Sequence, residues 1–299
     1  GTIPNKDLRW DSDTKIDLGF ESKLFDNRLE VTADYFNNTR TDLIIGGVPI
    51  SGINGGYAPG SGAPAVNAGK VKNSGFELVL NYKDNISDFK YDLGFNITTI
   101  NNEVLEVNNS TNYIEGGAFA IGQLPPTRME VGQPIGVFYG LQTDGIFQNM
   151  NDVFSHTGVE GDTLQPMAQP GDFRFVDVNG DGIIDADDRT MIGNPTPDWT
   201  AGLTIDMRYK NWDINIFGQG VFGNQIYNAT RRYDLPTSNM PASAIDRWTG
   251  EGSTNAYPRL TFNDVNKNFA RSSDFYVEDG SFFRLKSLQV GYNLTGGIA

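Results

Sequence analysis

The chain of 299 residues contains no cysteine and a single histidine. The absence of cysteine excludes disulfide bonds and thiolate metal sites, and the sequence shows no Ser/His/Asp or Cys/His arrangement typical of nucleophilic catalysis. No segment approaches the roughly 18 consecutive apolar residues that a membrane-spanning helix requires, so any membrane role would fall to strands. No signal peptide is recognisable at the N-terminus.

Cationic residues are also scarce. The chain has 23 Lys and Arg and 37 Asp and Glu, which gives a net charge of −14. No basic stripe is present, and this argues against a nucleic-acid partner. Carboxylates are so frequent that two of them close in sequence are no evidence for a glycosidase pair. We therefore expect a protein that is not an enzyme.

Glycine and aromatic residues, by contrast, are abundant, with 35 Gly, 19 Phe and 12 Tyr, and this composition favours β-structure. Apolar and polar residues alternate in several segments, as in strands that have one apolar face. The clearest stripe has Trp199, Leu203, Ile205 and Met207 on one face and Thr200, Thr204, Asp206 and Arg208 on the other. The alternation predicts three hairpins and a last strand, over residues 15–21 with 29–35, 76–82 with 91–97, 199–209 with 212–216, and 288–294.

Short and long connections follow one another regularly along the chain. The short turns are predicted at 26–27, 83–87 and 210–211, and the long excursions at 46–68, 101–197 and 223–280. Outer-membrane barrels have this asymmetry, with tight periplasmic turns and long extracellular loops. A soluble β-sandwich also alternates apolar and polar residues, but the regular succession of short and long connections favours the barrel. We then expect the stripe that contains Leu203 to face lipid.

Residues 177–188 have the ligand spacing of an EF-hand calcium loop. Oxygen-bearing side chains fill positions 1, 3, 5, 9 and 12, and Gly182 at position 6 permits the sharp turn. The predicted ligands are Asp177, Asn179, Asp181, the backbone carbonyl of Ile183, Asp185 and Asp188. Aspartate at position 12 is shorter than the usual glutamate, and an acidic turn that binds nothing is the alternative interpretation.

The segments that flank this loop indicate what a bound ion would do. Pro170 and Gly171 precede it, and Gly193, Asn194 and Pro195 follow it, so helices are not expected on either side. Without a pair of helices to open, calcium would be structural rather than a signal. If the short turns are periplasmic, the loop lies on the extracellular side.

A series of sequence blocks lies along the chain at 5–10, 67–69, 73–77, 132–140, 144–148, 170–172, 193–195, 257–260 and 279–286. In this order the blocks resemble those of the SusC/RagA-like family of TonB-dependent transporters. Because many separate blocks recur over nearly the whole chain, the resemblance is more specific than a single motif.

The resemblance implies an all-β fold, in which residues 1–299 form antiparallel strands of a 22-strand transmembrane barrel with long extracellular loops. It also implies an N-terminal plug, a SusD-like surface lipoprotein as lid, and a TonB complex that drives uptake. We expect a place in the outer membrane of a Gram-negative, Bacteroidetes-like cell and import of glycan oligosaccharides or peptides. The alternative is a soluble calcium-stabilised β-sandwich that binds glycan or mediates adhesion.

The chain also departs from this family. It shows no plug and no TonB box, and residues 296–299 end it without the usual terminal aromatic. We therefore expect a fragment of the barrel domain that lacks the plug and the last strands. Because an open sheet edge is not tolerated in lipid, the fragment alone should not transport.

Other candidate residues carry weaker signals. Phe147, Trp248 and Tyr257 could stack on a substrate, although packing between loops is the favoured interpretation. His156 is expected to be neither a ligand nor a base. The glycine-rich stretch 46–62 lacks the Lys-Ser/Thr of a phosphate-binding loop and is interpreted as a flexible outer loop.

Overall fold

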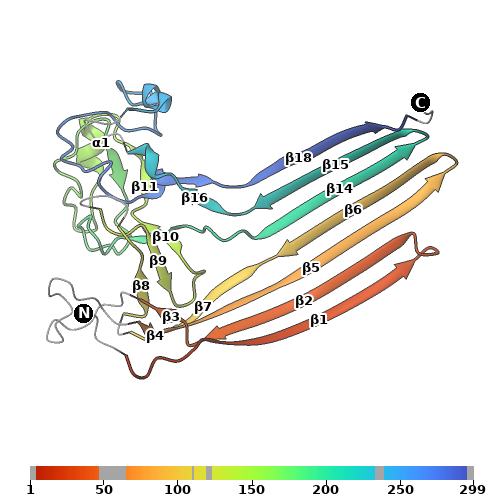
Figure 1. Cartoon of the computed structure of the whole chain (residues 1–299). Helices are drawn as coiled ribbons and strands as arrows, with labels where there is room; N and C mark the ends of the chain where they lie inside the picture. The colour runs from red at the N-terminus through yellow and green to blue at the C-terminus, as the bar shows by residue number, and fades with distance from the viewer. Residues whose placement is uncertain (1–4, 47–64, 110, 119–122, 233–238, 295–299) are drawn as a thin grey trace.

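The computed structural model describes residues 5–46, 65–109, 111–118, 123–232 and 239–294. Its main element is one antiparallel sheet with the strand order β1-β2-β5-β6-β14-β15-β18, in which β7 also pairs with β5. Figure 1 shows these strands as a long, curved slab. The strands are β1 (Ser12–Leu24), β2 (Leu29–Thr41), β5 (Gly69–Ile86), β6 (Phe89–Thr99), β7 (Asn101–Val107), β14 (Trp199–Tyr209), β15 (Trp212–Phe222) and β18 (Phe282–Tyr292).

All the predicted strands are present, and their short turns lie together at one end of the slab, opposite the long excursions (Figure 1). Asp26, Asn27 and Lys210 adopt positive φ angles of 56°, 64° and 53°, as tight turns require. The predicted tip at 83–87 was too wide, because β5 continues to Ile86 and pairs it with Phe89. The turn between them begins at Ser87, which has a φ of 55°.

The register places the apolar residues of neighbouring strands side by side on one face. Leu203 pairs with Phe95, and Ile205 pairs with Leu93 on one side and Ile216 on the other. Much of this face is open, since Leu203 and Phe95 each retain 36% of their accessible surface. A soluble β-sandwich would cover such a face with a second sheet, whereas the small sheets of the described residues gather at one end of this sheet (Figure 1).

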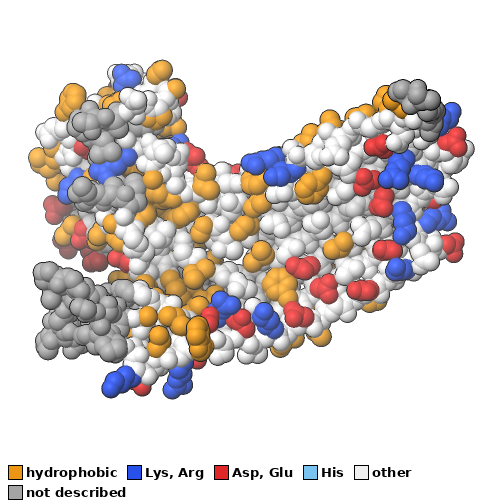
Figure 2. All heavy atoms as spheres, viewed as in Figure 1, with side chains coloured by type: hydrophobic (Ala, Val, Ile, Leu, Met, Phe, Trp, Pro, Cys, Tyr) orange, Lys and Arg blue, Asp and Glu red, His pale blue; other side chains and the backbone are white. Residues whose placement is uncertain are grey.

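The opposite face of the slab is polar and charged. Asp206 pairs with Asp92 and Asn215, and Arg208 pairs with Lys90 and Asp213. Figure 2 shows acidic and basic side chains gathered toward the turn end of the slab. The two faces therefore differ in the way that the sequence predicts.

The long excursions fold into a compact structure at the other end of the slab, which we call the cap: the described residues of 101–197 and 223–280 (Figure 1). In addition to β7, which pairs with β5 of the slab, the cap contains three small sheets, one short α-helix and three 3-10 helices. The sheets comprise β8 (Tyr113–Glu115), β9 (Thr127–Glu130), β10 (Val137–Gly140) and β13 (Thr190–Gly193); β11 (Thr143–Ile146) and β12 (Phe173–Phe175); and β16 (Gln225–Tyr227) and β17 (Val277–Asp279). The helices are α1 (Met150–Ser155), η2 (Ala229–Arg231), η3 (Ala242–Asp246) and η4 (Asp274–Tyr276).

The first excursion contributes β4 (Val66–Asn67) to the described structure, and β4 pairs with β3 (Ile44–Ile45), which lies just before the excursion begins. Nearly all of the predicted glycine-rich loop at 46–62 lies outside the described residues, as do residues 296–299. Among the described residues, no helix has the length and apolar character needed to cross a membrane.

Candidate functional site

The cap has a hydrophobic core to which both long excursions contribute. Leu141, Ile146, Phe173, Phe175 and Ile184 come from 101–197, and Phe269, Phe275 and Tyr276 come from 223–280. Because residues more than 80 positions apart in sequence share this core, the two excursions depend on each other for their fold.

The three aromatic residues proposed for substrate stacking all take part in packing. Phe147 is completely buried and packs with Val153 and Ala168, so its ring offers no surface to a substrate, and its assignment as a stacking residue is corrected. Trp248 and Tyr257 are half-buried and pack against the shared core. The Tyr257 hydroxyl accepts a hydrogen bond from Arg231 at 2.8 Å.

The predicted calcium loop has the expected backbone course. Gly180 and Gly182 have φ angles of 75° and 86°, and both donate N–H groups to the Asp177 carboxylate, at 2.7 and 2.9 Å. Ile184 is buried in the shared core and anchors the loop to it. The loop lies between β12 and β13, so it has no helix on either flank.

Asp188, at position 12, closes the loop. Its carboxylate is fully buried and accepts N–H groups from Val178 at 2.8 Å and from Asp185 at 2.8 Å. The remaining side chains are engaged locally, since Asn179 donates to Asp181 at 3.0 Å and Asp181 accepts from the Ile183 N–H at 2.9 Å. The first and last ligand positions are thus held close together.

The donor set fits a hard cation in kind, because carboxylate and amide oxygens are the ligands that calcium prefers. These side chains do not, however, all point toward one metal position. In the described part of the chain, no group of three or more His, Cys, Asp or Glu side chains is arranged to hold a metal ion. The backbone is therefore wound for a calcium loop, while several carboxylates bond to N–H groups of the loop itself.

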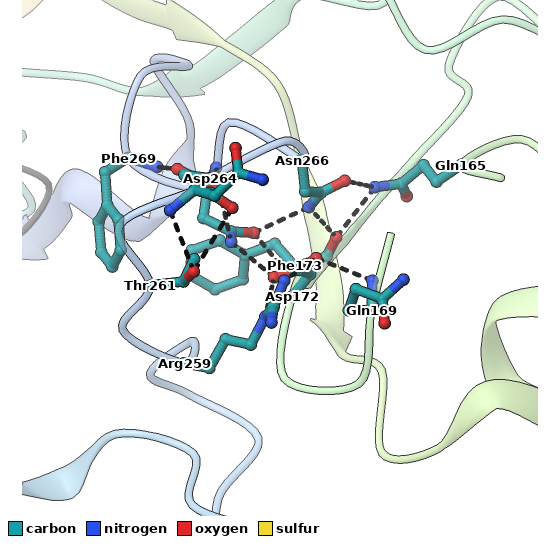
Figure 3. A network of polar contacts seen from close by, with 11 residues as sticks. Gln165, Gln169, Asp172, Phe173, Arg259, Thr261, Asp264, Asn266 and Phe269 are labelled. Carbon is teal, nitrogen blue, oxygen red and sulfur yellow. Dashed lines mark hydrogen bonds and ion pairs between the residues drawn. The ribbon is translucent and has the colours of Figure 1, made fainter. Parts of the chain in front are cut away.

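A buried polar network, which the sequence did not reveal, joins the excursions (Figure 3). The Asp172 carboxylate is fully buried and accepts hydrogen bonds from Arg259 Nε at 2.7 Å, Asn268 Nδ2 at 2.9 Å and the Gln169 N–H at 2.8 Å. Asn268 Oδ1 in turn accepts the N–H of Phe173 at 2.8 Å. We call this group the clasp.

Gln165 and Asn266 extend the clasp. Gln165 donates to Asn266 Oδ1 at 2.8 Å, and both side chains donate to the Phe173 carbonyl at 3.0 Å. Asn, Gln and Arg scattered over 165–268 carry no periodic signal, so only their contacts in space identify them as a unit.

His156 caps the end of α1 beside a small cavity lined also by Asp144 and Asp177. Its ring lies 5.6 Å from that of Phe147. Burial, with a smaller contribution from Arg174, lowers the pKa of His156 below its ordinary value. A neutral imidazole here is consistent with a packing residue.

A large cavity lies far from the cap, on the polar face at the turn end of the slab. It has a volume of about 830 Å³ and is lined mainly by charged side chains, including Arg28, Lys83, Asp84 and Asp206. Arg28 pairs with Asp84 at 3.0 Å.

Comparison with known proteins identifies the fold. Residues 1–298 match the family model described as TonB dependent receptor-like, beta-barrel. TonB-dependent receptor P3 of Formosa agariphila is 31% identical over 293 residues, which cover 97% of this chain and 28% of that protein. TonB-dependent receptor SusC of Bacteroides thetaiotaomicron is 27% identical over 97% of this chain and 26% of its own length.

A solved structure agrees with these relatives. The chain superposes on a structure of the RagAB peptide transporter with a TM-score of 0.72 and 21% identity, covering 96% of this chain and 29% of that one. The chain thus spans between a quarter and a third of the length of the proteins that it matches.

Proposed function

The chain belongs to the TonB dependent receptor-like β-barrel family, and on this premise we propose that it is part of an outer-membrane importer that works without covalent chemistry. The single observation that carries this proposal is the one-sided slab with all short turns at one end and the cap at the other. An apolar face suits lipid and a polar face suits a lumen. The cap would then lie on the extracellular side, where a solute first meets the protein.

We infer that the imported solute is a glycan oligosaccharide or a peptide. The family resemblance supports the first class, and the description of RagAB as a peptide transporter supports the second. Uptake of labelled oligosaccharides and labelled peptides into cells that carry the full-length protein tests both. We expect uptake that is lost when a protonophore collapses the membrane energy; equal uptake in cells without the protein would contradict the proposal.

We further propose that a SusD-like lipoprotein contacts the cap, and that the importer couples to a TonB complex. Phe262 is fully exposed and Ile245 retains 76% of its accessible surface, both on 223–280. Exposed apolar side chains of this size mark candidate contact surfaces. Deleting 223–280 would be a poor test, because that excursion supplies Phe269 and Tyr276 to the shared core.

Point variants separate contact from folding. Phe262→Ser together with Ile245→Ser should reduce co-purification of the lipoprotein with the full-length transporter, since neither side chain is part of the buried core. Val159→Ser, at another highly exposed apolar position of the cap, is the matched control. Undiminished co-purification of the double variant would place the contact elsewhere.

We also propose that loop 177–188 binds one structural calcium ion through Asp177, Asn179, Asp181, the Ile183 carbonyl, Asp185 and Asp188. The spacing, the φ angles of Gly180 and Gly182 and the closure by Asp188 support this. Calcium would neutralise carboxylates that otherwise repel one another. The affinity should be in the range of extracellular modules, about 10⁻⁴ to 10⁻³ M.

Limited proteolysis of the full-length protein with calcium or with chelator tests this site. We expect cleavage within 171–194 only in chelator, while the strands stay intact because calcium would hold only the loop. Asp181→Ala should be cleaved in both conditions, whereas Asp187→Ala, at a position that is not a predicted ligand, should behave as the native protein. Equal cleavage of the native protein in both conditions would show that the loop is an acidic turn that does not bind calcium.

A further inference from the structure

A second cavity of the cap combines positive charge with an apolar lining. It has a volume of about 280 Å³ and lies between the end of the calcium loop and segment 267–272. We call it the basic pocket; its lining includes Arg189, Lys267, Arg271, Asp185, Leu124 and Leu141. Three cationic side chains and one carboxylate thus line it, in a chain whose net charge is −14, and the nearby Asp188 and Asp264 also interact electrostatically with Arg271.

Arg271 has donor capacity that the protein does not use. Its Nη2 donates to the Ile184 carbonyl at a long 3.5 Å, and its guanidinium lies 5.0 Å from the ring centre of Phe175. Its Nη1 is buried and has no hydrogen-bond partner among the described residues. A buried guanidinium N–H without an acceptor is costly, and an anion in the pocket would supply one.

The neighbouring carboxylates already bond to other donors. Asp188 accepts N–H groups from its own loop, and Asp185 accepts the N–H of Asp187 at 2.8 Å. Asp264 accepts from Asn268 Nδ2 at 3.0 Å. None of the hydrogen bonds found in the described part of the chain joins Arg271 to a carboxylate.

The other two cations differ in how they are held. Arg189 is nearly buried and pairs with Glu115 at 2.9 Å, while its second nitrogen donates to the carbonyls of Pro125 and Tyr139. Lys267 is exposed and takes part in none of the ion pairs found between described residues. Arg189 is therefore a fixed part of the wall, whereas Lys267 and Arg271 are available to a ligand.

We propose that the basic pocket binds one oxyanion group, a carboxylate or a sulfate, through Arg271 and Lys267. The planar guanidinium fork suits an oxyanion with two adjacent oxygens, and the apolar side chains of Leu124 and Leu141 lower the local dielectric, which strengthens the attraction. The volume is just below the range of ordinary small-molecule sites, so the pocket holds a single charged group rather than an oligomer.

This binding does not depend on transport, since an anion site is measurable in purified protein without an energised membrane. Failure of the uptake assay and failure of anion binding are therefore separate results. The two sources of such a group are an acidic peptide and an acidic glycan.

Fluorine NMR of trifluoroacetate with the full-length protein in detergent gives the direct test. We expect concentration-dependent line broadening, with a dissociation constant in the millimolar range, that sodium sulfate and sodium acetate reverse. Triglutamate and trigalacturonate as competitors distinguish the peptide source from the glycan source, and neutral maltotriose should not compete.

Variants decide whether the pocket is responsible. Lys267→Met should weaken trifluoroacetate binding about tenfold, the loss expected for one charge-assisted hydrogen bond. Lys15→Met removes the same charge from an exposed position on β1 and should leave binding unchanged. Arg271→Gln should weaken binding further. If this variant folds poorly because Arg271 loses its contacts to Ile184 and Phe175, Lys267→Met alone still tests the pocket. Absence of broadening in the native protein, or equal binding in Lys267→Met and Lys15→Met, would overturn the proposal.

Discussion

Replacing Arg259 with methionine tests whether the clasp holds the two excursions together. The change keeps an apolar stem of similar length but removes two donors from the Asp172 carboxylate, at 2.7 and 3.3 Å. Breaking a buried ion pair by removing one partner costs about 3 to 5 kcal/mol.

The cost in this molecule should be smaller. Asp172 keeps the donors from Asn268 and from the Gln169 N–H, and the Arg259 side chain is 26% exposed, so water can reach the gap. We expect a loss of about 2 to 3 kcal/mol in the free energy of opening of the cap, below the range for a fully enclosed pair.

Hydrogen exchange of the full-length protein measures this opening. A loss of this size should speed exchange of cap amides roughly 30- to 150-fold, because each 1.36 kcal/mol is a factor of ten. Two backbone amides report on the clasp directly. The Phe147 N–H donates to the Asp172 carbonyl, and the N–H of residue 259 donates to the Gly171 carbonyl in the native protein. Amides of β14 and β15 should not change.

Arg174→Met provides the matched control. Arg174 pairs with Asp144 at 2.6 Å, but the Asp144 side chain is 68% exposed, and such surface pairs contribute about 1 kcal/mol or less. If Arg259→Met exchanges no faster than Arg174→Met, the clasp does not join the excursions and the reasoning fails.

Three further changes have expected outcomes. Leu203→Arg should lower the free energy of unfolding of the full-length barrel in lipid vesicles by about 2 to 4 kcal/mol, whereas Thr204→Arg on the polar face should cost far less; equal costs would contradict the assignment of faces. Gly171→Ala should speed proteolysis of the cap, since a Cβ there lies 2.6 Å from Trp248 at a φ of +93°; unchanged cleavage would contradict this crowding. Because burial lowers the pKa of His156, the unfolded chain binds its proton first, so cap stability should fall as pH drops below about 6.5. A His156→Gln variant should lose that part of the pH dependence in hydrogen exchange, and an unaltered profile would exclude His156 as its source.

The strands of the slab were predictable because each depends on local alternation. Trp199–Tyr209 needs only its own sequence to define an apolar and a polar face. The hairpin tips were predictable to within a few residues; the error at 83–87 arose because Lys83, Asp84 and Asn85 look like turn residues but project from β5. On a barrel, polar residues can continue a strand wherever they face water.

The cap was not predictable, because its contacts join distant parts of the chain. Asp172 and Arg259 are separated by 87 positions, and neither lies in a periodic pattern. Packing was the favoured interpretation for Phe147, but its partners Val153 and Ala168 could not be named from the sequence. The calcium loop could be found because its signal lies within twelve residues, but its metal binding stays a prediction.

The core shared by the two excursions limits how members of this family can be recombined. A chimera that exchanges only 101–197 with a relative would place foreign side chains against Phe269, Phe275 and Tyr276. The foreign excursion would also need a carboxylate at the position of Asp172 to pair with Arg259. The smallest unit that can be transplanted is therefore the pair of excursions, which are separate in sequence but fold as one unit in space.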